Sequence, residues 1–446
     1  MKRFFTVLSE EDLEDWRRTH YSSQIKPDLN DDNVLVMGWV SSIRDHGNIT
    51  FIMITDKDGE IQVTAKLDEC GKILFDKIRE VKEHSSIGVK GKVRMMQNAP
   101  NGAEVIPEEM KIFSIAKKVP PFQVYSRTVP NIDIRLDLRA IDLRRKVLRA
   151  VFNIRHNTLN AIREFLNKEG FIEVNTPKII ATATEGGAAL FPIFYYDREA
   201  FLVQSPQLYK EQLTMAFEHV FEIGPIFRAE PSRTMRHLSE AISIDVEEIF
   251  VDYNDVINLL ERMVVYIIEY VIKNKSEELE VLQNKIDKPS LPFPRYSYNE
   301  LIELLKKEDE RIEWGDDFST DNLKKLGSII QGYYFITDWP SISKPFYTKP
   351  KISDEKLCES FDLMYGELEI SSGSSRINRK DKLLERMKKQ GLNTEAFDYH
   401  LRVFDYGVPP HAGFGLGLER FLMTFTGVEN IRDTTLYPRD KDRLAP

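Results

Sequence analysis

A proline-rich stretch at residues 119–131, VPPFQVYSRTVPN, divides the chain into two parts with different patterning. Proline removes a backbone donor and disfavours helix in the residue before it, so neither a helix nor a central strand continues through this stretch. The chain, at 446 residues, is also longer than one ordinary domain. We therefore predict a hinge at residues 119–140 and a large second domain at residues 141–446.

The part before the hinge alternates apolar and polar residues between turn signals, which is typical of short strands. Five such segments follow one another between residues 34 and 116, and Asp58-Gly59 marks a hairpin between two of them. Five short strands in a unit of this size predict a small barrel of the OB-fold kind at residues 18–118. Residues 1–17 then form an N-terminal extension.

Apolar residues return at helical spacing after the hinge, and Gly170 ends the predicted helix. Strand-like segments and long helices follow, one of them near residues 255–273, without a regular strand–helix–strand order. That mixture predicts an α+β domain on a mostly antiparallel sheet flanked by helices. Residues 275–350 are charged and irregular, and look like an insertion.

Composition excludes several classes of protein. A net charge of −9 argues weakly against nucleic-acid binding, although a local basic face remains compatible with it. Cys70 and Cys358 lie far apart without a CxxC spacing, which disfavours disulfides and zinc and fits a reducing cytoplasm. The chain start lacks the apolar core of a secretory signal. The most apolar stretch, residues 263–272, is too short to span a bilayer and reads as a buried helix.

The common nucleotide-binding signatures are missing, because the chain has no GxxxxGK[ST] loop and no GxGxxG after a strand. An ATP site must therefore depend on side chains. Four segments supply candidates, and each also has a purely structural explanation. The first, GFIEVNTP at residues 170–177, can be no more than a helix stop, a strand and a proline that ends it.

The second segment, residues 227–247, has two strand-like runs joined by a polar loop that contains further Arg and His residues. Arg228 and Glu230 share one face of a strand because the side-chain period is two. As an exposed ion pair they would contribute about 0–1 kcal/mol. Beside a cationic loop they would instead bind phosphate and adenine.

The third and fourth segments are EISSGSSR at residues 369–376 and GFGLGLERF at residues 413–421. Glu369 and Ser372 can offer oxygen ligands to Mg²⁺, or the segment is a simple Ser/Gly turn. Glycines spaced by two leave one strand face bare, so a flat ring could lie against the backbone. Tight packing between a strand and the helix that follows it would explain these glycines. It would not explain Arg420, which stands where that helix begins.

Taken in order, these segments resemble motifs 1, 2 and 3 of the class II aminoacyl-tRNA synthetases: Pro177, FRAE at residues 227–230 and GLGLER at residues 415–420. Other segments are similar to the aspartyl enzymes of archaeal and eukaryotic type, among them TPKIIATATEGGAALF, QSPQLYK, GVPPHAGFGLG and YPRDKDRLAP. The resemblance covers residues 18–446. It implies an aspartate–tRNA ligase that activates L-aspartate with ATP, esterifies tRNA and forms a homodimer through motif 1.

The resemblance also implies a role for each matched residue. Arg228 would bind the α-carboxylate and the α-phosphate, stabilising charge as the carboxylate attacks, and no general base is needed because the nucleophile is already an anion. The residues implied around ATP are Arg228, Glu230, Arg236, His237, Gly417 and Arg420. Those implied around the substrate ammonium are Glu185, Gln207 and Asp245, and those implied around Mg²⁺ are Glu369 and Ser372.

Selectivity for aspartate would then depend on two cations, Lys210 and Arg376, that face the side-chain carboxylate. Asparagine would leave them unpaired in a buried site. The alternative for Lys210 is a surface lysine. The rival family, the asparaginyl-tRNA synthetases, shares the fold, but an amide substrate does not call for an added cation. An asparagine-forming paralogue would lack the barrel, and a non-enzymatic regulator would have lost Arg228, Glu369 or Arg420.

The barrel resembles the anticodon-binding domain of the family, with Phe51 placed to stack on anticodon bases and Gln62 placed to hydrogen-bond them. The alternative for Phe51 is a core aromatic. Ser41 and Pro100 occupy positions that separate enzymes restricted to tRNA-Asp from those that also charge tRNA-Asn, and they favour the relaxed kind. Such an enzyme would hand Asp-tRNA-Asn to an amidotransferase.

Overall fold

The computed structural model describes residues 8–126, 128–182, 190–230, 234–308 and 310–446. The chain folds into two compact units, Met1–Ile134 and Arg135–Pro446, and their boundary falls within the stretch predicted as a hinge. The described residues include no helix long and apolar enough to cross a membrane, and the apolar residues 263–272 lie within a buried helix.

The first unit is a closed five-stranded barrel with the strand order β1-β2-β3-β5-β4, as predicted for an OB-fold. β2 and β3 form the antiparallel hairpin expected around Asp58-Gly59. Alternate side chains of the strands fill the barrel interior with aliphatic residues. The strands are β1 (Asn33–Asp45), β2 (Ile49–Thr55), β3 (Glu60–Lys66), β4 (Ser86–Met95) and β5 (Ala103–Ser114).

Two features of this unit go beyond the prediction. Helix α1 (Leu67–Glu80) follows β3 and buries Phe75 and Ile78 against the barrel. Residues 8–17 pack on the barrel rather than standing apart from it, because Trp16 is buried and the ammonium of Lys90 lies 4.4 Å from its ring centroid.

The second unit is built on an eight-stranded sheet with the order β12-β13-β14-β15-β16-β11-β10-β6. Only the edge pairs β12–β13 and β10–β6 are parallel, so the prediction of a mostly antiparallel sheet is confirmed. Its strands are β6 (Ile172–Glu173), β10 (His219–Phe227), β11 (Glu240–Ile249), β12 (Arg295–Ser297), β13 (Tyr333–Thr337), β14 (Ser360–Tyr365), β15 (Leu368–Ser375) and β16 (His411–Gly417). A second, three-stranded sheet contains β7 (Ile179–Ile180), β8 (Pro192–Tyr195) and β9 (Arg198–Leu202).

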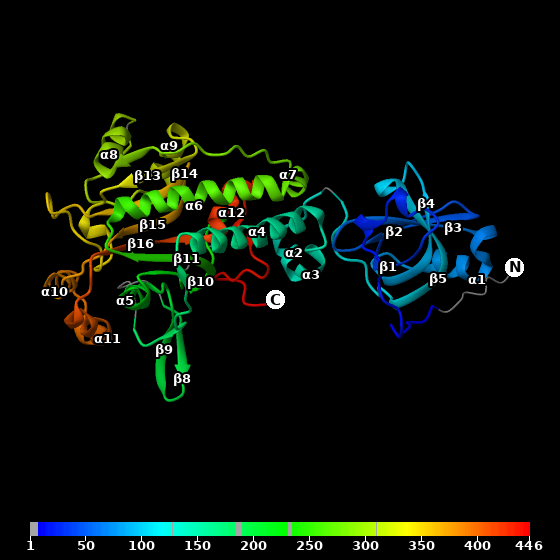
Figure 1. Cartoon of the computed structure of the whole chain (residues 1–446), viewed down its shortest axis with the longest axis horizontal. Coiled ribbons are helices and arrows are strands. Elements are labelled where there is room, and N and C mark those ends of the chain that lie inside the picture. The colour runs from blue at the N-terminus through cyan, green and yellow to red at the C-terminus, as the bar shows by residue number, and fades with distance from the viewer. Residues whose placement is uncertain (1–7, 127, 183–189, 231–233, 309) are drawn as a thin grey trace. The chain divides into compact units, whose positions relative to one another are not determined.

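Helices flank the large sheet, and the long α4 and α6 run across it as neighbours (Figure 1). Their apolar faces form the main core together with alternate strand residues such as Val246, Phe414 and Leu416. The helices are α2 (Ile132–Asp137), α3 (Arg139–Asp142), α4 (Lys146–Lys168), α5 (Gln207–Phe217), α6 (Tyr253–Asn274), α7 (Ser276–Leu282), α8 (Tyr298–Lys307), α9 (Thr320–Ile329), α10 (Lys380–Lys389), α11 (Asp398–Leu401) and α12 (Leu418–Thr426).

Residues 170–180 contain two short strands in different sheets, β6 and β7, with Pro177 between them. One local prediction needs correction, because residues 275–350 are not irregular. They contain α7, α8 and α9 as well as β12 and β13, which extend one edge of the large sheet.

The glycines of β16 lie on the sheet face opposite the helix-covered core. Gly413, Gly415 and Gly417 pair with Glu247, Asp245 and Ser243 of β11, whereas the intervening residues enter the core. A Cβ atom on Gly413 would stand 2.1 Å from the carbonyl oxygen of Val246, so that position accepts only glycine. One face of this strand is therefore bare, as predicted.

Candidate active site

A cavity of about 290 Å³ is lined by side chains from β10, β11, β15, β16, α5 and α12 and from the segments that follow β10. It collects residues that are more than 200 positions apart in the sequence, and most of the predicted site residues are among them. The predicted residues that line the cavity are Gln207, Arg228, Glu230, Arg236, His237, Asp245, Glu369, Ser372, Arg376, Gly417 and Arg420.

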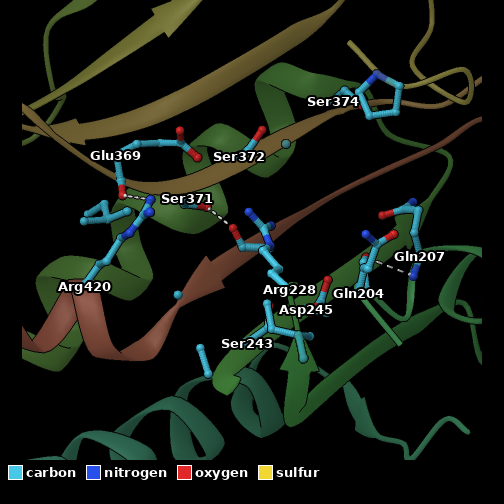
Figure 2. A pocket seen from close by; sticks show the side chains of 18 of the residues that line it. Gln204, Gln207, Arg228, Ser243, Asp245, Glu369, Ser371, Ser372, Ser374 and Arg420 are labelled. Carbon is cyan, nitrogen blue, oxygen red and sulfur yellow. Dashed lines mark hydrogen bonds between the residues drawn. The ribbon is translucent and has the colours of Figure 1, made fainter. Parts of the chain in front are cut away.

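The cavity has two chemically different ends. Glu369, Ser372 and Arg420 lie at one end, and Gln204, Gln207 and Asp245 lie at the other (Figure 2). Arg228 lies between the two groups, with its side chain in the space that they enclose (Figure 2). A ligand spanning the cavity would place its middle beside this guanidinium.

The first end is strongly cationic. Arg420, at the start of α12, donates to the backbone carbonyl oxygens of Arg236 at 3.3 Å and Glu369 at 3.2 Å. Burial lowers the pKa of His237, and the nearby Arg420, Arg228 and Arg236 lower it further, although Glu230 opposes them. His237 is therefore mainly neutral at neutral pH, and the charge available to phosphates comes from the arginines.

Oxygen donors for a divalent cation lie next to this cationic end. Glu369 and Ser372 are both accessible on β15, and Asp362 of β14 pairs with Ser372 across the hairpin. Lys344 binds both oxygens of Asp362, at 3.0 and 2.7 Å. The set has too few side-chain ligands for an all-protein cage, but it fits Mg²⁺, which keeps waters and takes substrate phosphates as ligands.

Asp362 is a residue that the sequence interpretation missed. Burial raises the pKa of this carboxyl and Glu369 raises it further, whereas Lys344 lowers it. The available signal was the hairpin-like segment FDLMYGELEISS. In such a hairpin Asp362 on the first strand and Glu369 on the second would face the same side of the sheet. The pairing of the two strands had to be known before that signal could be used.

The opposite end carries acceptors suited to an ammonium group. Gln204, Gln207 and Asp245 are almost fully buried and line the cavity. Among the described residues the Oε1 atom of Gln204 has no hydrogen-bond partner, although a buried amide oxygen normally has one. Gln204 was also missed as a site residue, and it completes a group of three acceptors.

The two predicted selectivity cations have different positions. Arg376 lines the cavity and binds both oxygens of Glu247, at 2.9 and 3.1 Å. Lys210 lies behind the wall, only 2% exposed, with its ammonium 3.1 Å from Asp245 and 3.3 Å from Glu247. It is therefore not a surface lysine. It contacts Asp245, which lines the cavity, and Glu247, which binds Arg376.

One predicted position has no outcome, because Glu185 lies outside the described residues. Ile242 of β11 packs against the helix-covered core, on the strand face opposite Ser243 and Asp245, and does not line the cavity.

The predicted anticodon residues share one surface of the barrel. Phe51 is half-buried outside the barrel core, with its ring edge-on to His46 at 5.8 Å, so it is not a core aromatic. Gln62 is also half-buried and donates from Nε2 to Glu104 at 2.9 Å. Ser41 is 8% exposed and donates to the carbonyl oxygen of Met53. Pro100 begins a one-turn 3₁₀ helix, Pro100–Gly102, between β4 and β5.

Comparison with known proteins agrees with this architecture. Residues 131–441 match the family described as tRNA synthetases class II (D, K and N), and residues 34–113 match the OB-fold nucleic acid binding domain. The chain belongs to the class II tRNA synthetases of this group, and it is an aminoacyl-tRNA synthetase. Enzymes of this class use ATP together with a divalent metal ion.

Its curated relatives are similar along nearly the whole chain. A protein of Methanothermobacter thermautotrophicus named Aspartate--tRNA(Asp/Asn) ligase is 48% identical, with 97% of this chain and 100% of the relative covered. A protein of Methanocaldococcus jannaschii with the same name is 47% identical, with 97% and 99% covered.

Solved structures have the same fold. Asparaginyl-tRNA synthetase from Pyrococcus horikoshii, complexed with asparaginyl-adenylate, superposes with a TM-score of 0.92 at 32% identity, covering 97% of this chain and 100% of that chain. Aspartyl-tRNA synthetase from Entamoeba histolytica superposes with a TM-score of 0.84 at 29% identity, covering 100% and 94%.

Proposed function

We propose that this protein activates L-aspartate with ATP and transfers it to tRNA-Asp and tRNA-Asn, releasing AMP and pyrophosphate. The observation that carries the proposal is the position of Arg228 between a cationic end with metal donors and an end with ammonium acceptors (Figure 2). Adenylate formation joins a carboxylate to an α-phosphate, and Arg228 lies where these two groups would meet. The names of the two archaeal relatives described above support the same amino acid and both tRNAs.

In this proposal the side chains position two anions and stabilise the charge that develops between them. Arg228 binds the α-carboxylate and the α-phosphate, and Arg420 and Arg236 hold the outer phosphates. Glu230 accepts from the adenine amino group, and His237 donates a hydrogen bond rather than a charge. Gly417 leaves room for the ring against the strand. The substrate carboxylate attacks without a general base, because it is already ionised.

Mg²⁺ is the divalent ion that the donor set suits best. Glu369 and Ser372 would hold it beside the phosphates, and Asp362 would hold it through water or directly, with Lys344 keeping that carboxylate oriented. The ion would neutralise phosphate charge during the in-line displacement. The arginines then need to bind only the charge that remains.

The residues at the amino-acid end of the cavity support aspartate as the substrate. Gln204, Gln207 and Asp245 would surround the α-ammonium. Arg376 has five N–H donors, and three of them are used by Glu247 and Ser374, which leaves two for a substrate carboxylate. Asparagine would present an NH₂ group to these donors. A site built for one hydrogen-bonding pattern rejects the other strongly.

An asparaginyl-tRNA synthetase is the second candidate, because one of the similar structures carries that name. Lys210 argues against it. A second buried cation between Asp245 and Glu247 keeps those carboxylates from repelling an acidic substrate, and an uncharged amide would not require it. The two archaeal proteins named for aspartate are also 48% and 47% identical to this chain, against 32% for the asparaginyl-tRNA synthetase of Pyrococcus horikoshii.

The proposal is tested by charging purified tRNA transcripts with labelled aspartate and, in parallel, with asparagine. One transcript carries the anticodon GUC and the other carries GUU. We expect aspartate to be esterified to both at rates within about ten-fold of each other, a gap of under about 1.4 kcal/mol. Charging restricted to GUC would contradict the inference from Ser41 and Pro100. Charging with asparagine alone would overturn the assignment of the amino acid.

Replacing Phe51 with alanine is expected to raise the KM for tRNA about ten-fold, because stacking on one ring is worth roughly 1–3 kcal/mol per base. Adenylate formation should not change, since the barrel takes no part in that step. Phe113→Ala is the matched control, because it removes a half-buried aromatic ring from β5 of the same barrel. An equal rise in both variants would mean that the barrel is destabilised and that Phe51 has no special role.

Three further parts of the proposal come from family resemblance. Pro177 and the neighbouring strands would form part of a two-fold dimer interface. Relaxed tRNA recognition would imply an amidotransferase that converts Asp-tRNA-Asn to Asn-tRNA-Asn. The aspartylation and the later amidation would both take place in the cytoplasm. The two free cysteines are compatible with that compartment.

A further inference from the structure

A buried polar cluster lies directly behind the amino-acid end of the cavity. Glu211 of α5, His400 of α11 and His411 of β16 are each at most 3% exposed. One carboxylate oxygen of Glu211 lies 3.5 Å from Nε2 of His400 and 3.6 Å from Nε2 of His411. Burying three ionisable groups is costly unless they satisfy one another. Packing alone therefore does not explain why these three ionisable side chains are buried together.

The other oxygen of Glu211 connects the cluster to the cavity. Gln207 stands one helical turn earlier on α5, so the two side chains lie on the same face of the helix. Nε2 of Gln207 donates to Oε1 of Glu211 at 2.7 Å, a short hydrogen bond between two buried groups. Gln207 in turn lines the cavity. Glu211 does not line the cavity, and among the described lining residues it hydrogen-bonds to Gln207.

The acceptor oxygen of Glu211 determines which way the side-chain amide of Gln207 must face. Nδ1 of His411 lies 2.8 Å from the carbonyl oxygen of Pro409, which only accepts, so the histidine donates there and directs Nε2 at the carboxylate. Burial alone would raise the pKa of Glu211, but the nearby His411 and His400 and the charge of Arg376 lower it to about 2. An ionised carboxylate can only accept. The NH₂ group of Gln207 is therefore held against Glu211, and its oxygen atom is held away from it.

We propose that Glu211 is a positioning residue, which fixes the side-chain amide of Gln207 with its oxygen toward the cavity, ready to accept from the α-ammonium of the substrate amino acid. This inference rests on the proposed function only in that Gln207 must contact an amino acid. A free amide would present its NH₂ group to the ammonium in half of its orientations and repel it. With Glu211 in place, Gln207 joins Asp245 and Gln204 as a third preset acceptor.

Two single substitutions separate positioning from a simple charge effect. Glu211→Asp keeps the negative charge in the cluster but is one methylene too short to reach Gln207. Glu211→Gln removes the charge but keeps an acceptor oxygen at the same reach, while its NH₂ can donate to a neutral His411. Both changes are small, so both variants should fold. Glu261→Asp is the matched control, because it shortens another buried carboxylate of the same domain, on α6, that does not line the cavity.

The measurement is ATP–pyrophosphate exchange with purified full-length enzyme, varying L-aspartate and ATP separately. We expect Glu211→Asp to raise the KM for aspartate about ten-fold, with the KM for ATP and kcat changed less than about three-fold. Glu211→Gln and Glu261→Asp should leave all three constants within about three-fold of the wild type. A larger loss in Glu211→Gln than in Glu211→Asp, equal losses in both, or no change in either would overturn the proposal.

A double-substitution cycle tests whether the effect passes through Gln207. In a Gln207→Ala background, Glu211→Asp should raise the KM for aspartate no further, and a second ten-fold rise would overturn the proposal. The wild type is measured first. If it activates asparagine and not aspartate, the proposed function fails, and the same comparison is made with the KM for asparagine, since both amino acids carry the α-ammonium group.

Discussion

Replacing Arg228 with alanine is expected to lower aspartate-dependent ATP–pyrophosphate exchange by about 10³-fold or more, mainly through kcat. Loss of one donor at a developing charge typically lowers a rate by about 10²–10³-fold, and a guanidinium between carboxylate and phosphate supplies more than one donor. The side chain is exposed in the cavity and adds nothing to the core. The melting temperature should therefore stay within about 2 °C of the wild type.

The control for this prediction is Arg163→Ala. That arginine also has an accessible side chain, 40% exposed and paired with Glu173 on the surface, and it does not line the cavity. It should change exchange activity less than about two-fold, as expected for a surface ion pair. If adenylate still forms at near wild-type rate in Arg228→Ala, the assignment of the cavity as the ATP site is wrong.

Replacing Arg376 with glutamine is expected to lower kcat/KM for aspartate on the order of 100-fold, because the substrate carboxylate loses its charged partner. Burial opposes the charge of this guanidinium, yet Glu247 raises the pKa of Arg376 above its ordinary value, so it is cationic throughout the working pH range. Glutamine retains an NH₂ group for Glu247, which limits the cost of leaving that carboxylate buried. The measurement is exchange with aspartate and asparagine side by side.

The activity of Arg376→Gln with asparagine should not fall. The ratio of kcat/KM for aspartate to that for asparagine should therefore fall on the order of 100-fold. Arg295→Gln is the matched control, since Arg295 also binds a buried carboxylate, that of Glu261, but lies outside the cavity. Parallel losses with both amino acids would show that Arg376 supports the structure of the pocket and does not select the substrate.

Much of the site was predictable because its residues occupy short motifs. On a strand the side-chain period alone places Asp245 and Glu247 on one face and Val246 on the other, and the same period leaves Gly413, Gly415 and Gly417 bare. The barrel and the mostly antiparallel sheet likewise followed from local turn signals and periodicity. These properties need no knowledge of which segments meet.

The residues that were missed or misplaced depend on contacts between distant segments. Asp362 becomes a candidate metal ligand only when β14 pairs with β15, and Gln204 only when its segment closes the amino-acid end of the cavity. Residues 275–350 were taken as irregular because β12 and β13 are short and depend on the sheet edge for their hydrogen bonds. Charge and polarity read along the chain do not reveal such pairing.

The sequence by itself thus determined the family, the two kinds of domain and the side chains proposed to carry the chemistry, because each is encoded over a few neighbouring residues. Only the tertiary structure decided how those side chains are held. Lys210 could be a surface lysine or a buried one until β11 was found to lie beside it. Glu211, His400 and His411 form a cluster because α5, α11 and β16 converge there, and their charges depend on that shared burial. Burial and pairing are properties of the folded assembly, since water satisfies each of these groups separately in the unfolded chain.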